Sequence, residues 1–332
     1  MLDVATTRKM LAIILIAGMV ATLAAGAILA WRYRHGLFPP LRRRLVSWEL
    51  ADILISFVLI LLIPLLVLAI LKSRGFYLWW YGENPSKENE ALLARCTLWA
   101  YCIGFPFALL AVLGWLALRG TRPWQMGLTK WRFAPSLATG SMAWWLLTPA
   151  AFLINVTVNW FYIDVLKTQP AHHPLQKLGM GEAGSMEWAL IAFIAVVKAP
   201  FEEELLFRGL LLPWLAERWW SAPLAWSAAL IIAGLMGPGW LPVIYSGVVG
   251  LPLLLVCVRQ DILPTPLLAI YGSSLLFAVA HSGVWPTPIP LFVLGCGLGY
   301  LKWRTRSLVA PITLHALFNS VSTILMLTGL SE

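Results

Sequence analysis

The stretch LADILISFVLILLIPLLVLAIL, residues 50–71, contains a single charged side chain, Asp52. A helix rises 1.5 Å per residue, so this stretch would form a rod about 33 Å long, which is enough to cross the roughly 30 Å hydrocarbon core of a bilayer. A soluble core would need fewer and shorter apolar runs. The stretch therefore predicts a transmembrane α-helix.

Apolar runs of this kind recur along the whole chain. Of the 332 residues, 60% are hydrophobic and 12% are charged, whereas a soluble domain is about 45–50% apolar and about 25% charged. This composition excludes an ordinary cytosolic enzyme, a disordered chain and a collagen-like fibre. The pattern predicts an all-α, polytopic helical membrane protein with about eight to ten transmembrane helices. The candidate spans are residues 10–31, 50–71, 97–118, 136–158, 188–212, 223–238, 241–258, 264–282, 288–301 and 308–328.

The formal net charge of +9 does not indicate a nucleic-acid partner. Lys and Arg lie in short clusters between the apolar runs, and no separate basic domain is present to hold a duplex. Cytoplasmic loops of membrane proteins are enriched in Lys and Arg, and the larger share lies inside when residues 32–49, 119–135 and 302–306 are placed there. We expect an integral, multi-pass protein of a bacterial plasma membrane, with the lipid bilayer as a partner and no nucleic acid.

One apolar run is interrupted by the charged stretch PFEEELLFRG, residues 200–209. Each charge near the bilayer centre costs about 2.5–3.5 kcal/mol, so such groups are retained where they face a protein interior or a wet cavity. Glu204 and Arg208 are four residues apart and can pair on one helix face. Glu203 lies about 100° around the helix from Glu204, so both can face one cavity, and a carboxylate there is suited to be a general base. The alternative is a helix end whose charges reach the lipid headgroups.

Two histidines also lie within apolar runs. His281 follows Phe277 by four residues, and Asn319 follows His315 by four, so each pair shares a helix face. Alone, each histidine is typical of a satisfied interior residue. Together with the Glu cluster, they form a set that could hold a water molecule or a metal ion.

The three patterns Glu203-Glu204-x-x-x-Arg208, Phe277-x-x-x-His281 and His315-x-x-x-Asn319 resemble, in this order, the motifs of the CPBP family. This family contains the CAAX prenyl proteases of type II and bacteriocin-processing membrane proteins, and is also called the Abi family. The resemblance covers roughly residues 100–328. It implies an intramembrane peptidase in which these residues surround a catalytic water. The catalytic residues carried over are Glu203, Glu204, Arg208, His281, His315 and Asn319.

Hydrolysis of a peptide amide needs a nucleophilic water, a base and a stabiliser for the oxyanion. Either Glu204 or Glu203 would be the base, and His281 would polarise or share the water. His315 with Asn319 would donate to the oxyanion. Members of the family are described both as metalloproteases and as glutamate peptidases; if zinc is bound, the expected ligands are His281, His315 and Glu204, because three protein ligands and a water make a plausible catalytic zinc site. The expected substrate is a peptide or a membrane protein.

The chain departs from the family in the spacing between its first and second motifs. Arg208 and His281 are farther apart than is usual, and residues 223–262 between them are almost wholly apolar. We interpret them as an apolar insertion. The predicted domains are an N-terminal extension with two transmembrane helices, residues 1–96, and a protease core, residues 97–332, that carries the insertion around 223–262.

Two further function classes remain open from the sequence. One is a non-catalytic membrane scaffold or bacteriocin-immunity protein of the same family, which would tolerate Glu204→Gln where a peptidase would not. The other is a proton-coupled transporter that uses the Glu pair and the two histidines. Many transporters contain a repeated half with a matching broken helix, and the sequence shows no such repeat.

Overall fold

The computed structural model describes residues 46–76, 90–128, 133–171, 184–218, 221–258 and 265–328, and the predicted span 10–31 lies outside them. Within these ranges the regular elements are all helices, which confirms the predicted all-α fold. The longer helices are α2 (Leu50–Ser73), α4 (Glu90–Leu118), α6 (Phe133–Trp160), α8 (Ser185–Phe193), α11 (Ser221–Met236), α12 (Leu241–Val258), α13 (Thr265–Val279), α14 (Pro288–Thr305) and α15 (Val309–Leu327). The short helices are α5 (Pro123–Met126), α9 (Ala199–Glu203) and α10 (Leu212–Glu217).

The helices have the length and surface of membrane spans. In the described part of the chain, four stretches are long and apolar enough to cross a bilayer: Leu50–Ser73, Leu93–Leu118, Phe133–Val165 and Val309–Leu327. Large apolar side chains point outward from them, among them Leu61, Leu110 and Trp145. A soluble protein rarely exposes apolar patches of this extent, whereas lipid tails accept them. The protein is therefore an integral membrane protein.

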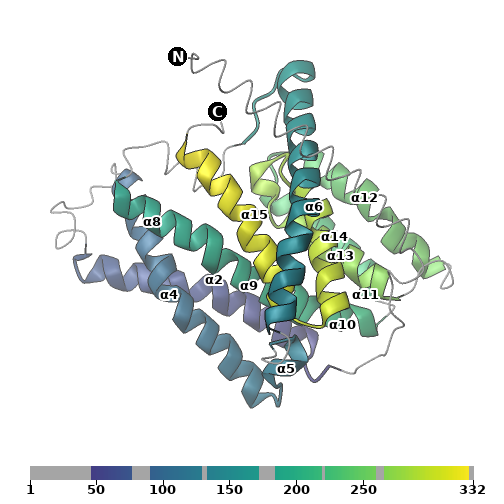
Figure 1. Cartoon of the computed structure of the whole chain (residues 1–332), viewed down its shortest axis with the longest axis horizontal. Helices are drawn as coiled ribbons and strands as arrows, with labels where there is room; N and C mark the ends of the chain where they lie inside the picture. The colour runs from purple at the N-terminus through teal and green to yellow at the C-terminus, as the bar shows by residue number, and fades with distance from the viewer. Residues whose placement is uncertain are drawn as a thin grey trace.

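The bundle is arranged around α15. Figure 1 shows α15, in yellow, beside α6 and beside the helical segment that begins with α8, and both contacts are direct. Two further pairs of helices pack along each other: α2 with α4, and α13 with α14. The two helices of the predicted insertion, α11 and α12, pack on each other and on α13 at the right of Figure 1.

Residues 185–217 form one long helical segment with two wide turns. The π-helical stretches η4 (Ile194–Lys198) and η5 (Glu204–Leu211) lie on either side of α9. Each ends two residues before a proline, Pro200 or Pro213. A proline ring clashes with the carbonyl four residues earlier and supplies no N–H. A turn widened to a five-residue repeat accommodates the ring, so the segment continues through both prolines.

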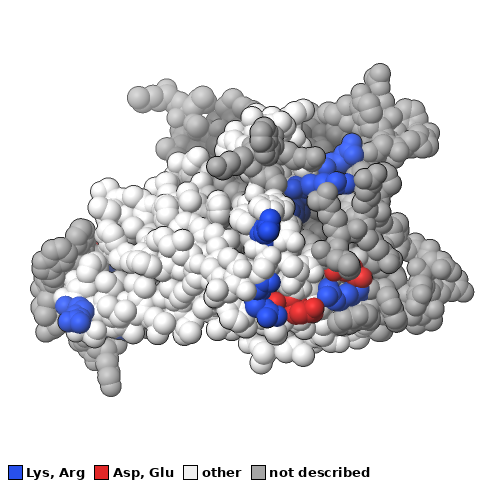
Figure 2. Space-filling view, turned by 90° about the horizontal axis from the view of Figure 1, so that it is seen from below, with Lys and Arg blue, Asp and Glu red and all other residues white. Residues whose placement is uncertain are grey.

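Several connecting segments meet at the lower end of the bundle in Figure 1. Ser47 Oγ lies 3.0 Å from Thr121 Oγ1, the Lys302 amine donates to the carbonyl of Met126, and the Leu308 N–H donates to the carbonyl of Gly127 at 2.9 Å. Figure 2 shows this face from below, with Lys and Arg groups in blue and smaller areas of Asp and Glu in red. The described residues of the segments predicted to be cytoplasmic, 46–49, 119–128 and 302–306, thus lie together at this end.

The helix α2, which belongs to the predicted N-terminal extension, packs into the same core as the motif-bearing helices. The indole N–H of Trp48, fully buried, donates to the carbonyl of Leu210 at 3.1 Å. The rings of Phe57 and Phe207 meet edge to face with centroids 5.4 Å apart. The predicted boundary at residue 96 lies within α4, and the two-domain division itself stays a prediction.

Candidate active site

Arg208 and Glu204 form a fully buried ion pair. Arg208 Nη1 lies 3.0 Å from Glu204 Oε1, and neither side chain is exposed. The second amino group, Nη2, donates to the carbonyl of Gly295 on α14 at 3.2 Å. The guanidinium also lies over the ring of Phe277, 4.3 Å from its centroid. The predicted pairing of these two residues is present, and the ring adds a cation–π contact.

Gly295 leaves little room for a side chain beside the guanidinium, and an added Cβ would require its neighbours to shift by a few tenths of an ångström. A Cβ at this position would lie 3.2 Å from Arg208 Nη2 and 3.1 Å from the Cβ of Ser274. Sequence reasoning missed Gly295, because nothing in an apolar run marks one carbonyl as an acceptor.

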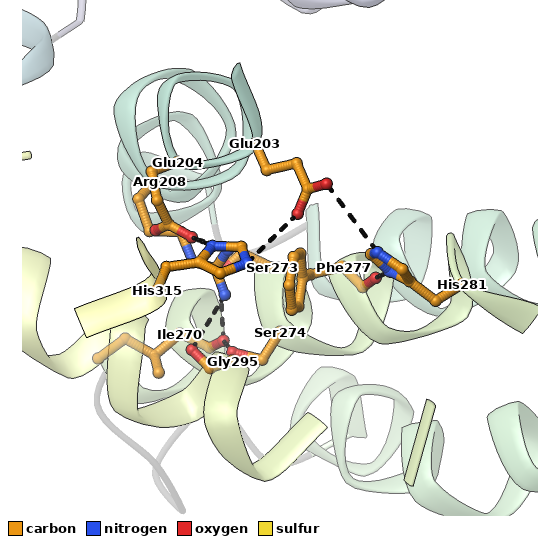
Figure 3. Close-up of polar contacts among 10 residues, drawn as sticks. All are labelled: Glu203, Glu204, Arg208, Ile270, Ser273, Ser274, Phe277, His281, Gly295 and His315. Carbon is orange, nitrogen blue, oxygen red and sulfur yellow. Dashed lines mark hydrogen bonds and ion pairs between the residues drawn. The ribbon is translucent and has the colours of Figure 1, made fainter. Parts of the chain in front are cut away.

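His315 lies between the two carboxylates of the motif. Its Nδ1 is 2.9 Å from Glu204 Oε1, and its Nε2 is 3.8 Å from Glu203 Oε2. The ring is nearly buried, at 4% side-chain exposure. Glu204 therefore holds one nitrogen of the imidazole by a direct hydrogen bond, and the other nitrogen faces Glu203 (Figure 3).

His281 faces the Glu203 carboxylate from the side opposite His315. Its Nδ1 lies 2.9 Å from the carbonyl oxygen of Phe277, one turn earlier on the helix. Since a carbonyl only accepts, Nδ1 is the protonated nitrogen of this bond. The other nitrogen, Nε2, lies 4.0 Å from Glu203 Oε1. Figure 3 shows the Glu203 carboxylate between the two histidines, above the ring of Phe277.

The cluster has an inner part and an accessible part. The Glu204 and Arg208 side chains are fully buried, while Glu203 and His281 are exposed by 26% and 25%. A molecule that enters the site therefore meets Glu203 and His281 first. Glu203 ends α9 and Glu204 begins η5, so adjacent residues take these two different positions.

Asn319 makes a different contact from the one expected. Its side-chain Nδ2 donates to the backbone carbonyl of Ala195, in η4, at 2.8 Å. Five of the six predicted catalytic residues thus form one connected cluster, and the described hydrogen bond of Asn319 joins α15 to the backbone of the helix that carries Glu203.

A second buried ion pair lies on the same helix. Lys198 Nζ donates to Glu202 Oε2 four residues later, and the ammonium also lies 5.1 Å from the centroid of the Tyr101 ring on α4. Both side chains are nearly buried. The spacing of Lys198 and Glu202 in an apolar run was the available signal, but the sequence analysis assigned neither residue a role.

The predicted zinc ligands His281, His315 and Glu204 are not arranged to bind one zinc ion. Glu204 Oε1 is already bound by Arg208 and by His315 Nδ1, and His281 faces Glu203 instead. Among the residues that the structure describes, no group of three or more His, Cys, Asp or Glu side chains is placed to hold a metal ion.

A comparison with protein-family models matches two stretches of the chain, residues 185–269 and 260–321, to the family described as type II CAAX prenyl endopeptidase Rce1-like. Residues 185–321 are thus similar to this family. The matched part contains all three motifs, which confirms the predicted resemblance to the CPBP family of CAAX proteases. No curated protein and no solved structure matches the chain.

Proposed function

We propose that this Rce1-like protein is an intramembrane endopeptidase that hydrolyses a peptide bond with a water activated by Glu203. The observation that carries the proposal is the position of the Glu203 carboxylate. One of its oxygens faces His281 Nε2 at 4.0 Å and the other faces His315 Nε2 at 3.8 Å, and the side chain is partly accessible. Glu204, the other candidate base, is fully buried, and its Oε1 is bound by both Arg208 Nη1 and His315 Nδ1.

The separation of Glu203 and His281 suits two groups that share one water molecule. A distance of 4.0 Å is too long for a direct hydrogen bond, and a bridging water is the usual alternative. His281 Nδ1 carries the proton donated to Phe277, so Nε2 of the neutral ring is an acceptor. The water would donate one hydrogen to Glu203 and the other to His281, which leaves an oxygen lone pair for attack on a carbonyl carbon.

In the first step, the water oxygen forms a bond to the peptide carbon while Glu203 takes one of its protons. The carbonyl oxygen becomes an oxyanion. In the second step the C–N bond breaks, the carbonyl re-forms, and the proton on Glu203 passes to the leaving amine. A positioned general base of this type typically contributes about 10²–10⁴-fold to the rate.

His315 is the donor best placed for the oxyanion. Its Nδ1 is fixed by Glu204, and its Nε2 faces the accessible carboxylate. Nδ1 donates to the Glu204 carboxylate, and the proposed role requires that Nε2 also carries a hydrogen, which it would donate to the developing negative charge. Removal of one such donor typically lowers kcat about 10²–10³-fold. Glu204 and Arg208 then act as positioning residues for this ring.

Substrate trapping tests the proposal. Membranes with the wild-type protein, Glu203→Gln or Glu49→Gln would be compared by mass spectrometry for peptides that differ. Glu49 is a matched control because its side chain is 67% exposed and lies outside the cluster. We expect wild type and Glu49→Gln to yield the same cleaved peptide, and Glu203→Gln to co-purify with the intact substrate. Cleavage by Glu203→Gln at the wild-type rate would exclude Glu203 as the base.

A further inference from the structure

The helix that carries Glu203 loses a backbone hydrogen bond shortly before the motif. In η4 the N–H of Ala199 bonds to the carbonyl of Ile194, five residues earlier. The next residue is Pro200, which has no N–H. The carbonyl of Ala195 therefore receives no hydrogen bond from position 200. A carbonyl without a partner is especially costly within a bilayer, where no water replaces the missing donor.

Asn319 supplies the missing donor from another helix. Its Nδ2 donates to the Ala195 carbonyl at 2.8 Å. Asn319 lies one turn after His315 on the same face of α15, and His315 is bonded to Glu204. The helix α15 thus holds the long helical segment at two points, one in η4 and the other at the start of η5.

We infer that Pro200 and Asn319 form a positioning pair for the catalytic centre. The proline leaves the Ala195 carbonyl free, and the Asn319 amide binds it, which fixes α15 along the helix of Glu203. His315 Nε2 is thereby kept facing Glu203. The inference rests on the proposed function, and it gives Asn319 a role distinct from the direct oxyanion contact that the motif implies.

A double-mutant cycle separates these two roles. Pro200→Ala restores an N–H that can bond to the carbonyls of this turn. If Asn319 acts by holding Ala195, Asn319→Ala will lower kcat about tenfold in the wild-type background, with little change in KM, because His315 is no longer held facing Glu203; tenfold corresponds to about 1.4 kcal/mol. In the Pro200→Ala background, the same substitution will lower kcat clearly less.

Pro213→Ala is the matched control, because Pro213 follows the other π-helical stretch, where the N–H of Leu212 bonds to Phe207. In that background Asn319→Ala should cause its full loss. An equal loss in the wild-type and Pro200→Ala backgrounds would overturn the inference and assign Asn319 to the reacting atoms.

Thermal unfolding in detergent distinguishes failure of this inference from failure of the proposed function. The four proteins compared are wild type, Asn319→Ala, Pro200→Ala and the variant with both substitutions. We expect the two substitutions to be non-additive in Tm, because they act on one carbonyl. If no variant cleaves, wild type included, the proposed function fails while non-additive Tm values still support the pair. Additive Tm values would contradict it whatever the activity.

Discussion

Replacement of Arg208 by Met tests whether the buried ion pair organises the site. Met fills most of the volume of the arginine stem, so the substitution chiefly removes charge. It leaves Glu204 buried with His315 as its one remaining described partner. Removal of one member of a buried pair costs about 3–5 kcal/mol, and loss of the desolvated contact with the Phe277 ring adds about 2 kcal/mol.

These losses are comparable with the whole stability of many folded proteins, about 5–15 kcal/mol. Arg208→Met should therefore lower the Tm strongly and reduce the amount of folded protein extracted from the membrane. The double variant Arg208→Met/Glu204→Gln removes both charges, and the Gln side chain keeps the volume of Glu204 and an oxygen that can accept from His315 Nδ1. Replacement of a buried ion pair by hydrophobic residues of similar volume is often neutral. We expect the double variant to regain most of the lost Tm but not the activity.

Thermal unfolding in detergent, followed by tryptophan fluorescence, measures the loss of Tm in Arg208→Met and its recovery in the double variant. A wild-type Tm for Arg208→Met would refute the reasoning, since an unpaired buried carboxylate would then cost little. A double variant no more stable than the single one would show that the destabilisation comes from packing and not from the charge of Glu204.

Three further outcomes follow from the contacts described above. Trp48→Phe keeps a buried ring but removes the donor to Leu210. It should lower the free energy of unfolding by about 1–3 kcal/mol in chemical denaturation. An unchanged free energy of unfolding would mean that this hydrogen bond does not stabilise the contact with η5. Lys198→Met should destabilise more than Lys198→Met/Glu202→Gln, and the reverse order of Tm values would exclude charge pairing as the cause. Cleavage should persist after incubation with EDTA, because Glu204 is already bound by Arg208; loss of activity that zinc restores would contradict this.

Much of the fold could be predicted from the sequence because the bilayer fixes helix length. The run 50–71 became α2, residues 50–73, and the run 308–328 became α15, residues 309–327. The wide turns η4 and η5 were not predicted. Apolar periodicity cannot separate a four-residue from a five-residue repeat over so few residues, although Pro200 and Pro213 marked where the helix had to deviate.

The site was predictable where the partners are close in sequence. Glu204 and Arg208 are one turn apart, and their pairing follows from helix geometry. The division of labour between Glu203 and Glu204 was not predictable, because it depends on how α15 crosses the catalytic helix. His315 lies only about 9 Å along α15 from its first residue, by a rise of 1.5 Å per residue, yet it reaches Glu204 in the middle of the long helix. The contact of Asn319 with a backbone carbonyl required the proline turn, which the motif spacing does not reveal.

Isotope labelling tests most directly the central claim, that Glu203 activates a water and does not itself attack the peptide. The trapped substrate would be cleaved in a single turnover, with enzyme in excess, in water enriched in oxygen-18, and both product and enzyme would be analysed by mass spectrometry. Direct attack by water predicts one oxygen-18 atom in the new carboxyl group of the product and none in the Glu203 peptide. Oxygen-18 in the side chain of Glu203 would show a covalent acyl intermediate and contradict the proposed mechanism.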